Sequence, residues 1–244
     1  MPQFPITTKV IDSEHALITE KSMLKHIISV LRLKINDELL LIDENEIAYK
    51  TVITELSKDF LKAKILHAEK SKRKLNFQLD LLQCTLKSGA MEFVVQKMTE
   101  LGTKNLYVMP SFRSVSKFNE KEALGKIEKW QKIADESCKQ CERADKPEIH
   151  YLKSMTELKE HAQNYDIVLA CIERSTNKTL KEALRGTAHA KVLVIIGPEG
   201  GFENNEIEFF KENNFETVSI SNLIYRAETA AISALAGVIY EYEL

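Results

Sequence analysis

From residue 75 onward, segments with the pattern of buried strands alternate with segments of helical pattern, and this order limits the possible folds more than any other feature. The segments 77–84, 166–172 and 191–196 are largely apolar, and shorter strands are expected at 106–109 and 215–220. Central strands of a parallel sheet have this pattern because helices cover both of their faces. The alternation therefore predicts an α/β domain with a covered parallel sheet.

The helix expected after residue 87 has clear start and stop signals. Ser88 is expected to cap its first turn, and Gly102 follows its last residue. Serine and glycine are favoured in these two places. Its buried face is expected to consist of Met91, Val94, Val95, Met98 and Leu101.

A longer helix is expected after Asn119, which forms a capping-box pattern with Glu122. Ser154 and Glu157 start a further short helix, and the last helix is expected at 228–240. The buried face of the longer helix is expected to consist of Leu124, Ile127, Trp130, Ala134 and Cys138.

The beginning of the chain differs from the rest and predicts a separate, small β-domain. A short amphipathic helix is expected at 23–33, followed by strands at 38–43, 47–53 and 60–66. Short polar turns between these strands favour antiparallel pairing. The predicted domains are residues 1–72 and residues 73–244.

The distribution of charge along the chain does not decide whether the protein binds RNA. The chain carries a formal charge of −2, yet residues 1–74 hold 13 Lys and Arg against 11 Asp and Glu, with a basic cluster at 70–74. A local excess of this kind fits RNA phosphates, and it fits an ordinary solvated surface equally well.

The cysteines and the apolar runs exclude several classes of protein. Cys138 and Cys141 lack the second pair or the nearby histidines of a zinc site, so two ordinary helix cysteines are expected, with no metal. No run approaches the ~20 apolar residues of a membrane helix, and the N-terminus lacks the pattern of a signal peptide. We therefore expect a cytoplasmic protein without membrane attachment.

Two strings that directly follow strands are candidates for a ligand site. The first is Gly197-Pro198-Glu199-Gly200-Gly201, where glycines allow the backbone to approach a ligand closely. The second is Asn222 to Ala231, with Arg226, Glu228 and Thr229 at the entrance of an apolar helix. Ligands of parallel sheets bind at the carboxyl ends of strands. A tight turn and plain helix capping remain the structural alternatives.

Common cofactor and catalytic motifs are missing from the sequence. It contains neither the G-x-G-x-x-G pattern of dinucleotide-binding folds nor the phosphate-binding G-x-x-x-x-G-K-[ST] pattern. It also lacks H-E-x-x-H and G-x-S-x-G, which argues against zinc proteases and α/β-hydrolases.

The two strings, taken with several others, resemble the RsmE family of ribosomal-RNA methyltransferases in the SPOUT superfamily. The resemblance covers essentially the whole chain, and the order of its motifs makes it specific. The further matching residues and strings are Leu31 to Lys34, Asp37, Lys87, Glu92, Gln96 to Gly102, Arg113 to Val115 and Glu136 to Arg143.

The resemblance implies a trefoil-knotted parallel-sheet domain preceded by a small PUA-like β-barrel that binds RNA. It implies S-adenosyl-L-methionine as cofactor, 16S rRNA of the small ribosomal subunit as partner, and a homodimer. The implied cofactor-binding residues are Leu169, Ala170, Cys171, Ile196, Gly197, Pro198, Glu199, Gly200, Gly201, Ile220, Ser221, Asn222, Leu223, Ile224, Arg226, Thr229 and Ala230. The implied RNA-binding residues are Arg32, Lys87, Gln96, Lys97, Glu100, Arg113, Gln140 and Arg143.

The chain departs from the family pattern at three places. Ser221 replaces a glycine and Leu223 an arginine in the third cofactor loop, and Gln3 stands where an arginine is usual. Each change removes either backbone freedom or positive charge that the family offers to its ligands.

The implied reaction methylates N3 of a uridine, which is a poor nucleophile until its proton leaves. Cationic help for the developing anion and a base are therefore needed. Arg226 is predicted to stabilise the anion, and Glu199 is predicted to act as the base or to position the cofactor. The structural alternatives are an ion pair of Arg226 with Glu228 and helix capping by Glu199.

Two other functions remain open from the sequence. One is a SPOUT methyltransferase that acts on a ribose hydroxyl or a transfer-RNA base, and the other is a noncatalytic RNA-binding assembly factor. The beginning of the chain and the string Gln96 to Gly102 favour ribosomal uridine, and Arg226 with the intact glycine string argues against a noncatalytic factor.

Overall fold

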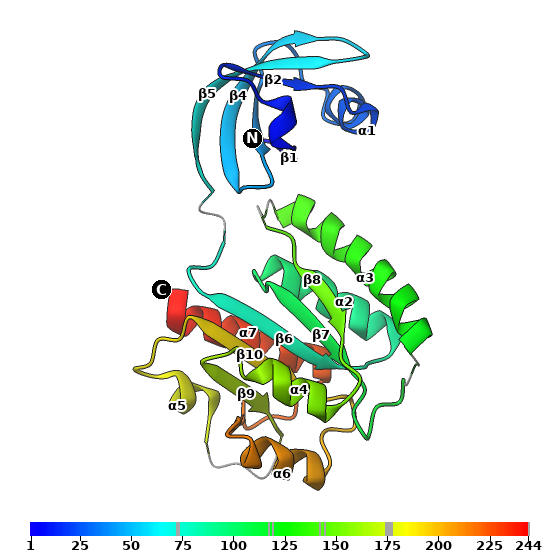
Figure 1. Ribbon diagram of the computed structural model, residues 1–244, viewed down its shortest axis with the longest axis vertical. Coiled ribbons are helices and arrows are strands. Elements are labelled where there is room, and N and C mark those ends of the chain that lie inside the picture. Colours follow the sequence, from blue (N-terminus) through cyan, green and yellow to red (C-terminus); the bar gives the residue numbers. More distant parts are fainter. Residues whose placement is uncertain are drawn as a thin grey trace. The chain divides into compact units, whose positions relative to one another are not determined.

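The computed structural model describes residues 1–71, 74–116, 118, 120–141, 143, 145–173 and 178–243 (Figure 1). The chain forms two compact units, Met1–Lys74 with Glu142–Asp145, and Leu75–Cys141 with Lys146–Leu244. The predicted domain boundary falls between residues 72 and 73, which both lie outside the described residues, so it stays a prediction. Among the described helices, none combines the length and the apolar character needed to cross a membrane.

The first unit is built on a five-stranded sheet in the order β1-β3-β4-β5-β2. Its strands are β1 (Gln3–Pro5), β2 (His15–Ile18), β3 (Glu38–Ile42), β4 (Ile47–Leu56) and β5 (Leu61–Lys70). Pairing is antiparallel except between β1 and β3. The mostly antiparallel β-structure expected here is confirmed.

One helical segment covers the core of this sheet. A short 3-10 turn, η1 (Thr8–Val10), precedes β2, and α1 (Lys21–Lys25) continues directly into a π-helical turn, η2 (His26–Val30). Leu24 and Ile27 are buried in the core, as the helical spacing indicates. The helix ends earlier than expected, because Arg32 adopts a left-handed conformation (φ 55°) that a helix cannot continue through.

The second unit contains a six-stranded sheet in the order β11-β9-β10-β6-β7-β8, and every neighbouring pair is parallel. Its strands are β6 (Gln78–Cys84), β7 (Asn105–Met109), β8 (Glu148–Tyr151), β9 (Ile167–Cys171), β10 (Lys191–Ile196) and β11 (Glu216–Val218). Its helices are α2 (Ser88–Glu100), α3 (Glu120–Cys141), α4 (Met155–Ala162), α5 (Leu180–Leu184), α6 (Asn204–Glu212) and α7 (Ala227–Glu243).

Helices cover both faces of this sheet, which explains why its central strands are apolar throughout (Figure 1). On β10, Val192 and Val194 pack into a core shared with α2, α3, α5 and α7. Leu193 and Ile195 point to the opposite face and pack with residues of α4 and α6. The predicted α/β class with a covered parallel sheet is confirmed.

The predicted cap of α2 was wrong, whereas its end and four of its five predicted buried positions were right; Leu101, just after the helix, is partly buried. Lys87 occupies the capping position without a side-chain hydrogen bond, and Ser88 is the first helical residue. The Ser88 hydroxyl instead bonds Glu92, 2.8 Å away, within the helix. Gly102 follows the helix with φ 87°, and a side chain there would also meet Leu75 at 3.0 Å. The buried residues of the predicted stripe are Met91, Val94, Val95 and Met98.

The predicted buried face of α3 was wrong at one position. Leu124 is 61% exposed, whereas its neighbour Ala123 is buried. Trp130, Ala134 and Cys138 are buried as predicted, and the series reaches them from Ala123 in steps of three and four residues. The capping residue expected for this helix, Asn119, lies outside the described residues.

The cap of α4 is confirmed, because the Ser154 hydroxyl accepts a hydrogen bond from the Glu157 amide at 3.3 Å. The short helices α5 and α6 had not been located from the sequence. Both follow strands that end at the same edge of the sheet, β9 and β10, and this edge carries the candidate site.

Candidate active site

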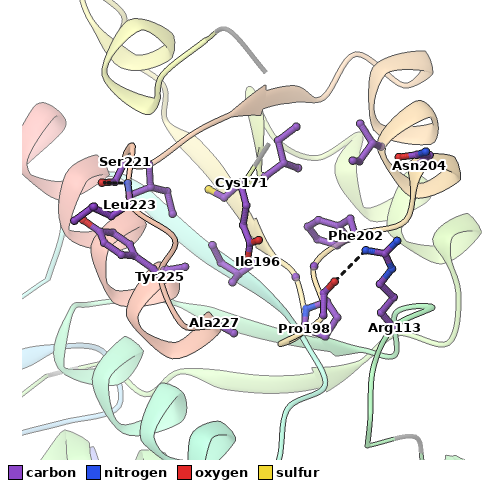
Figure 2. A pocket seen from close by; sticks show the side chains of 18 residues that line it. Arg113, Cys171, Ile196, Pro198, Phe202, Asn204, Ser221, Leu223, Tyr225 and Ala227 are labelled. Carbon is purple, nitrogen blue, oxygen red and sulfur yellow. Dashed lines mark hydrogen bonds between the residues drawn. The ribbon is translucent and has the colours of Figure 1, made fainter. Parts of the chain in front are cut away.

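Loops that follow β9, β10 and β11 surround a cavity of about 400 Å³ at the carboxyl edge of the sheet. Figure 2 shows Arg113, Phe202 and Asn204 on one side of it and Ser221, Leu223 and Tyr225 on the other. Its volume lies within the usual range for small-molecule sites, roughly 300–1,000 Å³. The sheet edge thus offers a preformed site for a ligand of small-molecule size.

Many of the residues predicted to bind a cofactor line this cavity. The lining members are Cys171, Ile196, Gly197, Pro198, Gly200, Gly201, Ile220, Ser221, Leu223 and Ala230. The other predicted residues are not among the lining residues: Leu169, Ala170, Glu199, Asn222, Ile224, Arg226 and Thr229. Leu169 and Ala170 are fully buried inside β9. The cofactor roles of all these residues stay predictions.

Sequence reasoning missed several lining residues. They are Phe202, Asn204, Ile207 and Ala227. Ile172, Glu173 and Tyr225 also line the cavity, and they lie in loops that the family resemblance assigns to the cofactor. Phe202 and Ile207 belong to the start of α6 and its approach, a helix that the sequence patterns had not located. The apolar pair Ile207 and Phe210, three residues apart and preceded by Glu203 and Glu206, was the signal that could have placed this helix.

The glycine string lies too close to its surroundings for larger residues. A side chain on Gly200 would approach the Cβ of Arg113 to 3.0 Å, and Gly201 has φ 68°. The string therefore needs glycine at these two positions for space and for backbone conformation. A tight turn explains Gly201, whereas the close approach of Arg113 explains Gly200.

Arg113 holds this loop from the side of β7. Its Nε lies 2.6 Å from Glu203 Oε1, and its Nη1 donates to the carbonyl oxygen of Gly200 at 3.2 Å. The hydrogen bond and charge of Glu203 raise the pKa of the Arg113 guanidinium. Arg113, predicted to bind RNA, thus contacts the loop of the cavity in this structure, and its RNA role stays a prediction.

A buried carboxylate connects the same region to the start of α6. Glu206 is 7% exposed and accepts hydrogen bonds from the Ser111 hydroxyl at 2.8 Å and from the Phe112 amide at 3.2 Å. Its second oxygen accepts from the Glu203 amide at 2.8 Å. These bonds fix the segment after β7 against the loop after β10.

The two predicted catalytic residues lie beside the cavity rather than in its lining. Arg226 stands between the lining residues Tyr225 and Ala227, with an exposed side chain. Glu199 is exposed and accepts a hydrogen bond from the Lys87 amide at 3.2 Å, at the start of α2. Glu199 therefore caps a helix other than the one that follows it. Their catalytic roles stay predictions.

The thiol of Cys171, which lines the cavity, is unreactive as a nucleophile. Burial raises the pKa of Cys171 to about 12, so the group is a neutral thiol near pH 7. A thiolate is the nucleophilic form of cysteine. Cys171 therefore offers the ligand an apolar surface and no nucleophile.

The third loop shows what the departure at Ser221 does. The Ser221 hydroxyl accepts a hydrogen bond from the Leu223 amide at 3.0 Å, which forms a local turn. Leu223 and Ile224 are 72% and 61% exposed beyond this turn. The loop thus presents apolar side chains to its surroundings where the family pattern has an arginine.

The residues predicted to bind RNA are distributed over both units. Arg32 and Arg143 belong to the first unit, and the remaining ones to the second. Arg32 is exposed, whereas the Arg143 side chain is 6% exposed and its Nη2 lies 2.8 Å from Asp145 Oδ2. The second-unit residues are Lys87, Gln96, Lys97, Glu100, Arg113 and Gln140.

On α2, Gln96 and Glu100 are exposed, and Lys97 binds Glu100 at 2.8 Å. The Lys97 ammonium also lies 5.7 Å from the ring centre of Phe93, which is 44% exposed. This face of α2 combines a cation with an exposed aromatic ring, and both groups are of the kinds that contact RNA.

The sequence of the chain matches the models of two known protein domain families. A model of an RNA methyltransferase domain matches residues 73–239, which is more than half of the chain. The chain belongs to this RNA methyltransferase family. A model of the RNA methyltransferase PUA domain matches residues 20–66. The predicted resemblance to RsmE proteins is confirmed, and the first unit is the PUA-like part.

RNA methyltransferases similar to this chain match it over nearly their full length. The ribosomal RNA small subunit methyltransferase E of Bacillus subtilis is 28% identical and covers 90% of this chain and 88% of its own. The protein named ribosomal RNA small subunit methyltransferase E 2 in Borreliella burgdorferi is 26% identical, over 97% and 96% of the two chains.

Solved structures show the same fold. A crystal structure described as a hypothetical protein superposes with a TM-score of 0.85 at 25% identity, over 99% of this chain and 98% of its own. The Neisseria gonorrhoeae ribosomal RNA small subunit methyltransferase E, bound to S-adenosyl methionine, gives 0.82 at 23% identity, over the same shares.

Proposed function

We propose that this protein transfers a methyl group from S-adenosyl-L-methionine to N3 of a uridine in 16S rRNA of the small ribosomal subunit. The observation that carries the proposal is the cavity at the carboxyl ends of β9 and β10, lined by the glycine string, in a chain of the RNA methyltransferase family. Relatives matched over nearly their whole length are named for methylation of small-subunit ribosomal RNA.

The lining of the cavity fits the proposed cofactor. Ile196, Ile220 and Ala230 supply apolar surface for an adenine ring, and the glycine string supplies backbone groups within reach of its edge. Neutral Cys171 adds no reactive thiolate. A structural relative holds this cofactor in the same fold. The trefoil knot implied by the family belongs to the same proposal.

The proposed chemistry needs little beyond positioning. S-adenosyl-L-methionine, when bound, supplies an already activated methyl group. The uridine N3 forms the new bond to carbon while the bond from sulfur to that carbon breaks, and the N3 proton must leave. Arg226 is proposed to stabilise the negative charge that develops on the uracil carbonyls, and Glu199 to receive the proton. The exposed Arg226 side chain is able to meet a base that arrives from outside the cavity.

The first unit is proposed to bind RNA, together with the predicted residues of the second unit, among them Lys87 before the start of α2 and Lys97 in its last turn. Its match to a PUA domain model supports this. Phosphate contacts by its lysines and arginines would add affinity that decreases with salt. The target uridine would have to leave its stack to reach the cavity.

A homodimer through the second unit is also proposed. The family resemblance implies this dimer. Tyr240, 72% exposed near the end of α7, is a position in the second unit at which it can be tested. An enzyme of ribosomal RNA in bacteria would work in the cytoplasm, so the predicted location is part of this proposal.

Mass spectrometry of ribosomal-RNA nucleosides tests the proposed function. We expect N3-methyluridine in 16S rRNA from cells that carry the gene and its loss from cells that lack it. Complementation with the wild-type gene should restore the nucleoside. Loss of a ribose-methylated or transfer-RNA nucleoside instead would overturn the proposed substrate. Calorimetry with S-adenosylhomocysteine checks the cofactor independently, because failure to bind it would favour a noncatalytic RNA-binding protein.

A further inference from the structure

The side chain of a buried glutamine in the sheet donates hydrogen bonds to the beginning of the glycine string. Gln83, next to the last residue of β6, is fully buried beside the end of β10. Its Nε2 lies 3.1 Å from the carbonyl oxygen of Gly197 and 3.4 Å from that of Ile196. Both of these residues line the cavity. A side chain behind the cavity thus holds two of its backbone groups.

The amide of Gln83 has only one workable orientation. Its nitrogen also lies 3.1 Å from the carbonyl oxygen of Cys84, so three acceptors surround one donor group. If the amide were rotated by half a turn, its Oε1 would face these three carbonyl oxygens and no hydrogen bond would form. Its own Oε1 is buried, with no hydrogen-bond partner in the part of the chain that the structure describes. The side chain therefore acts as a donor, at the cost of an unused acceptor.

The sequence explains why the loop needs such a donor. The peptide that joins Gly197 to Pro198 has no N–H, because the proline nitrogen carries none. The Gly197 carbonyl is the one hydrogen-bonding group by which this peptide plane is fixed. Glycine at this position adds rotational freedom on the other side of the same peptide. Gln83 thus fixes the first peptide plane of the loop, whereas the Arg113 guanidinium and the Pro198 carbonyl hold Gly200 and Gly201 further along.

We propose that Gln83 is a positioning residue of the cofactor site, which fixes the Ile196 and Gly197 carbonyls and so sets the loop that receives S-adenosyl-L-methionine. This rests on the proposed function. Gln83 touches neither cofactor nor substrate and acts through the loop. Its loss should therefore weaken cofactor binding more than it lowers the rate at saturating cofactor.

The variant Gln83→Met tests this, because methionine has nearly the same length and no amide donor. We expect S-adenosylhomocysteine to bind about tenfold more weakly, and the KM for S-adenosyl-L-methionine to rise more than kcat falls. The matched control is Thr99→Val, which removes a buried hydroxyl bonded within α2, 2.7 Å from the Val95 carbonyl oxygen. Thr99→Val should lower Tm without changing cofactor affinity.

The possible outcomes distinguish failure of the positioning role of Gln83 from failure of the proposed methyltransferase function. If Gln83→Met lowers Tm yet keeps wild-type cofactor affinity and KM, Gln83 is a structural residue only and the inference is overturned. The shorter amide of Gln83→Asn, which withdraws the donor by one methylene, is the deciding variant if Gln83→Met does not fold. It should show the same loss of affinity. Wild-type protein that binds no S-adenosylhomocysteine would contradict the proposed function itself.

Discussion

At the scale of single residues, Arg226 is the sharpest case, because its neighbours Tyr225 and Ala227 line the cavity while its own side chain is exposed. An arginine in this place can meet the acceptor base without contributing to cofactor binding. Interactions made only in the transition state act mainly on the rate.

Replacing Arg226 with alanine should therefore slow turnover about a hundredfold, the usual loss of ~3 kcal/mol for one such donor. The affinity for S-adenosylhomocysteine and Tm should stay close to wild type. Single-turnover methylation of small ribosomal subunits gives the rate. Glu228→Gln is the control for a simple ion pair and should be nearly neutral. Near-normal turnover of Arg226→Ala would end its catalytic assignment.

Arg32 allows structure and function to be separated at one position. Its φ of 55° is unfavourable for any residue with a side chain, by about 1–2 kcal/mol. Arg32→Gly should relieve this strain, so that Tm stays level or rises, while affinity for ribosomal RNA falls. Thermal melting and filter binding at two salt concentrations would measure both. Unchanged RNA affinity at low salt would remove Arg32 from the proposed interface.

At the scale of elements, close contacts with neighbouring residues determine the conformation of the loop after β10 and require glycine within it. A methyl group on Gly200 would lie 3.0 Å from the Cβ of Arg113, whereas one on Gly89 would meet nothing within 4 Å. The two glycines therefore form a matched pair for testing the loop.

We expect Gly200→Ala to displace the loop and to weaken S-adenosylhomocysteine binding at least tenfold, with a smaller change in Tm. Gly89→Ala lies in the first turn of α2 and should leave binding unchanged, with equal or slightly higher Tm. Calorimetry on both variants is sufficient. Equal affinities would show that the loop adapts to the added methyl group.

The same loops show how far sequence reasoning reaches. Strands apolar at nearly every position predicted the covered parallel sheet, and the rule for strand ends placed the site in the loops that follow them. The pattern does not say in which direction a loop side chain points, so Glu199 and Arg226 were expected in the cavity. Strand order also depends on contacts far apart in sequence, and no local pattern places β6 beside β10.

At the scale of the whole molecule, the division into two units predicts a division of work. Removing residues 1–72 should leave S-adenosylhomocysteine binding within a few-fold of wild type, because every residue that lines the cavity belongs to the second unit. Affinity for ribosomal RNA should fall and become less sensitive to salt. Far-UV circular dichroism and melting confirm that the remainder folds. A folded remainder without cofactor binding would contradict this division.

The proposed dimer has its own test. Wild-type protein at micromolar concentration should sediment as a dimer, and Tyr240→Glu should shift it towards monomer, because a charge would replace an exposed apolar ring near the end of α7. Gln163→Glu, at the exposed residue that follows α4, changes the charge by the same single unit and serves as the control. A monomeric wild-type protein would contradict the proposal.

The pairing of β6 with β10 has a consequence for synthesis. Gln83 and the Ile196 carbonyl that it contacts are separated by 113 residues. A ribosome that adds 5–20 residues per second needs roughly 6–23 s to cover that distance. Throughout this interval β6 lacks one of its two neighbours, with apolar side chains open to other nascent chains. Added chaperones that bind nascent chains should therefore raise the soluble yield of the second unit more than that of the first.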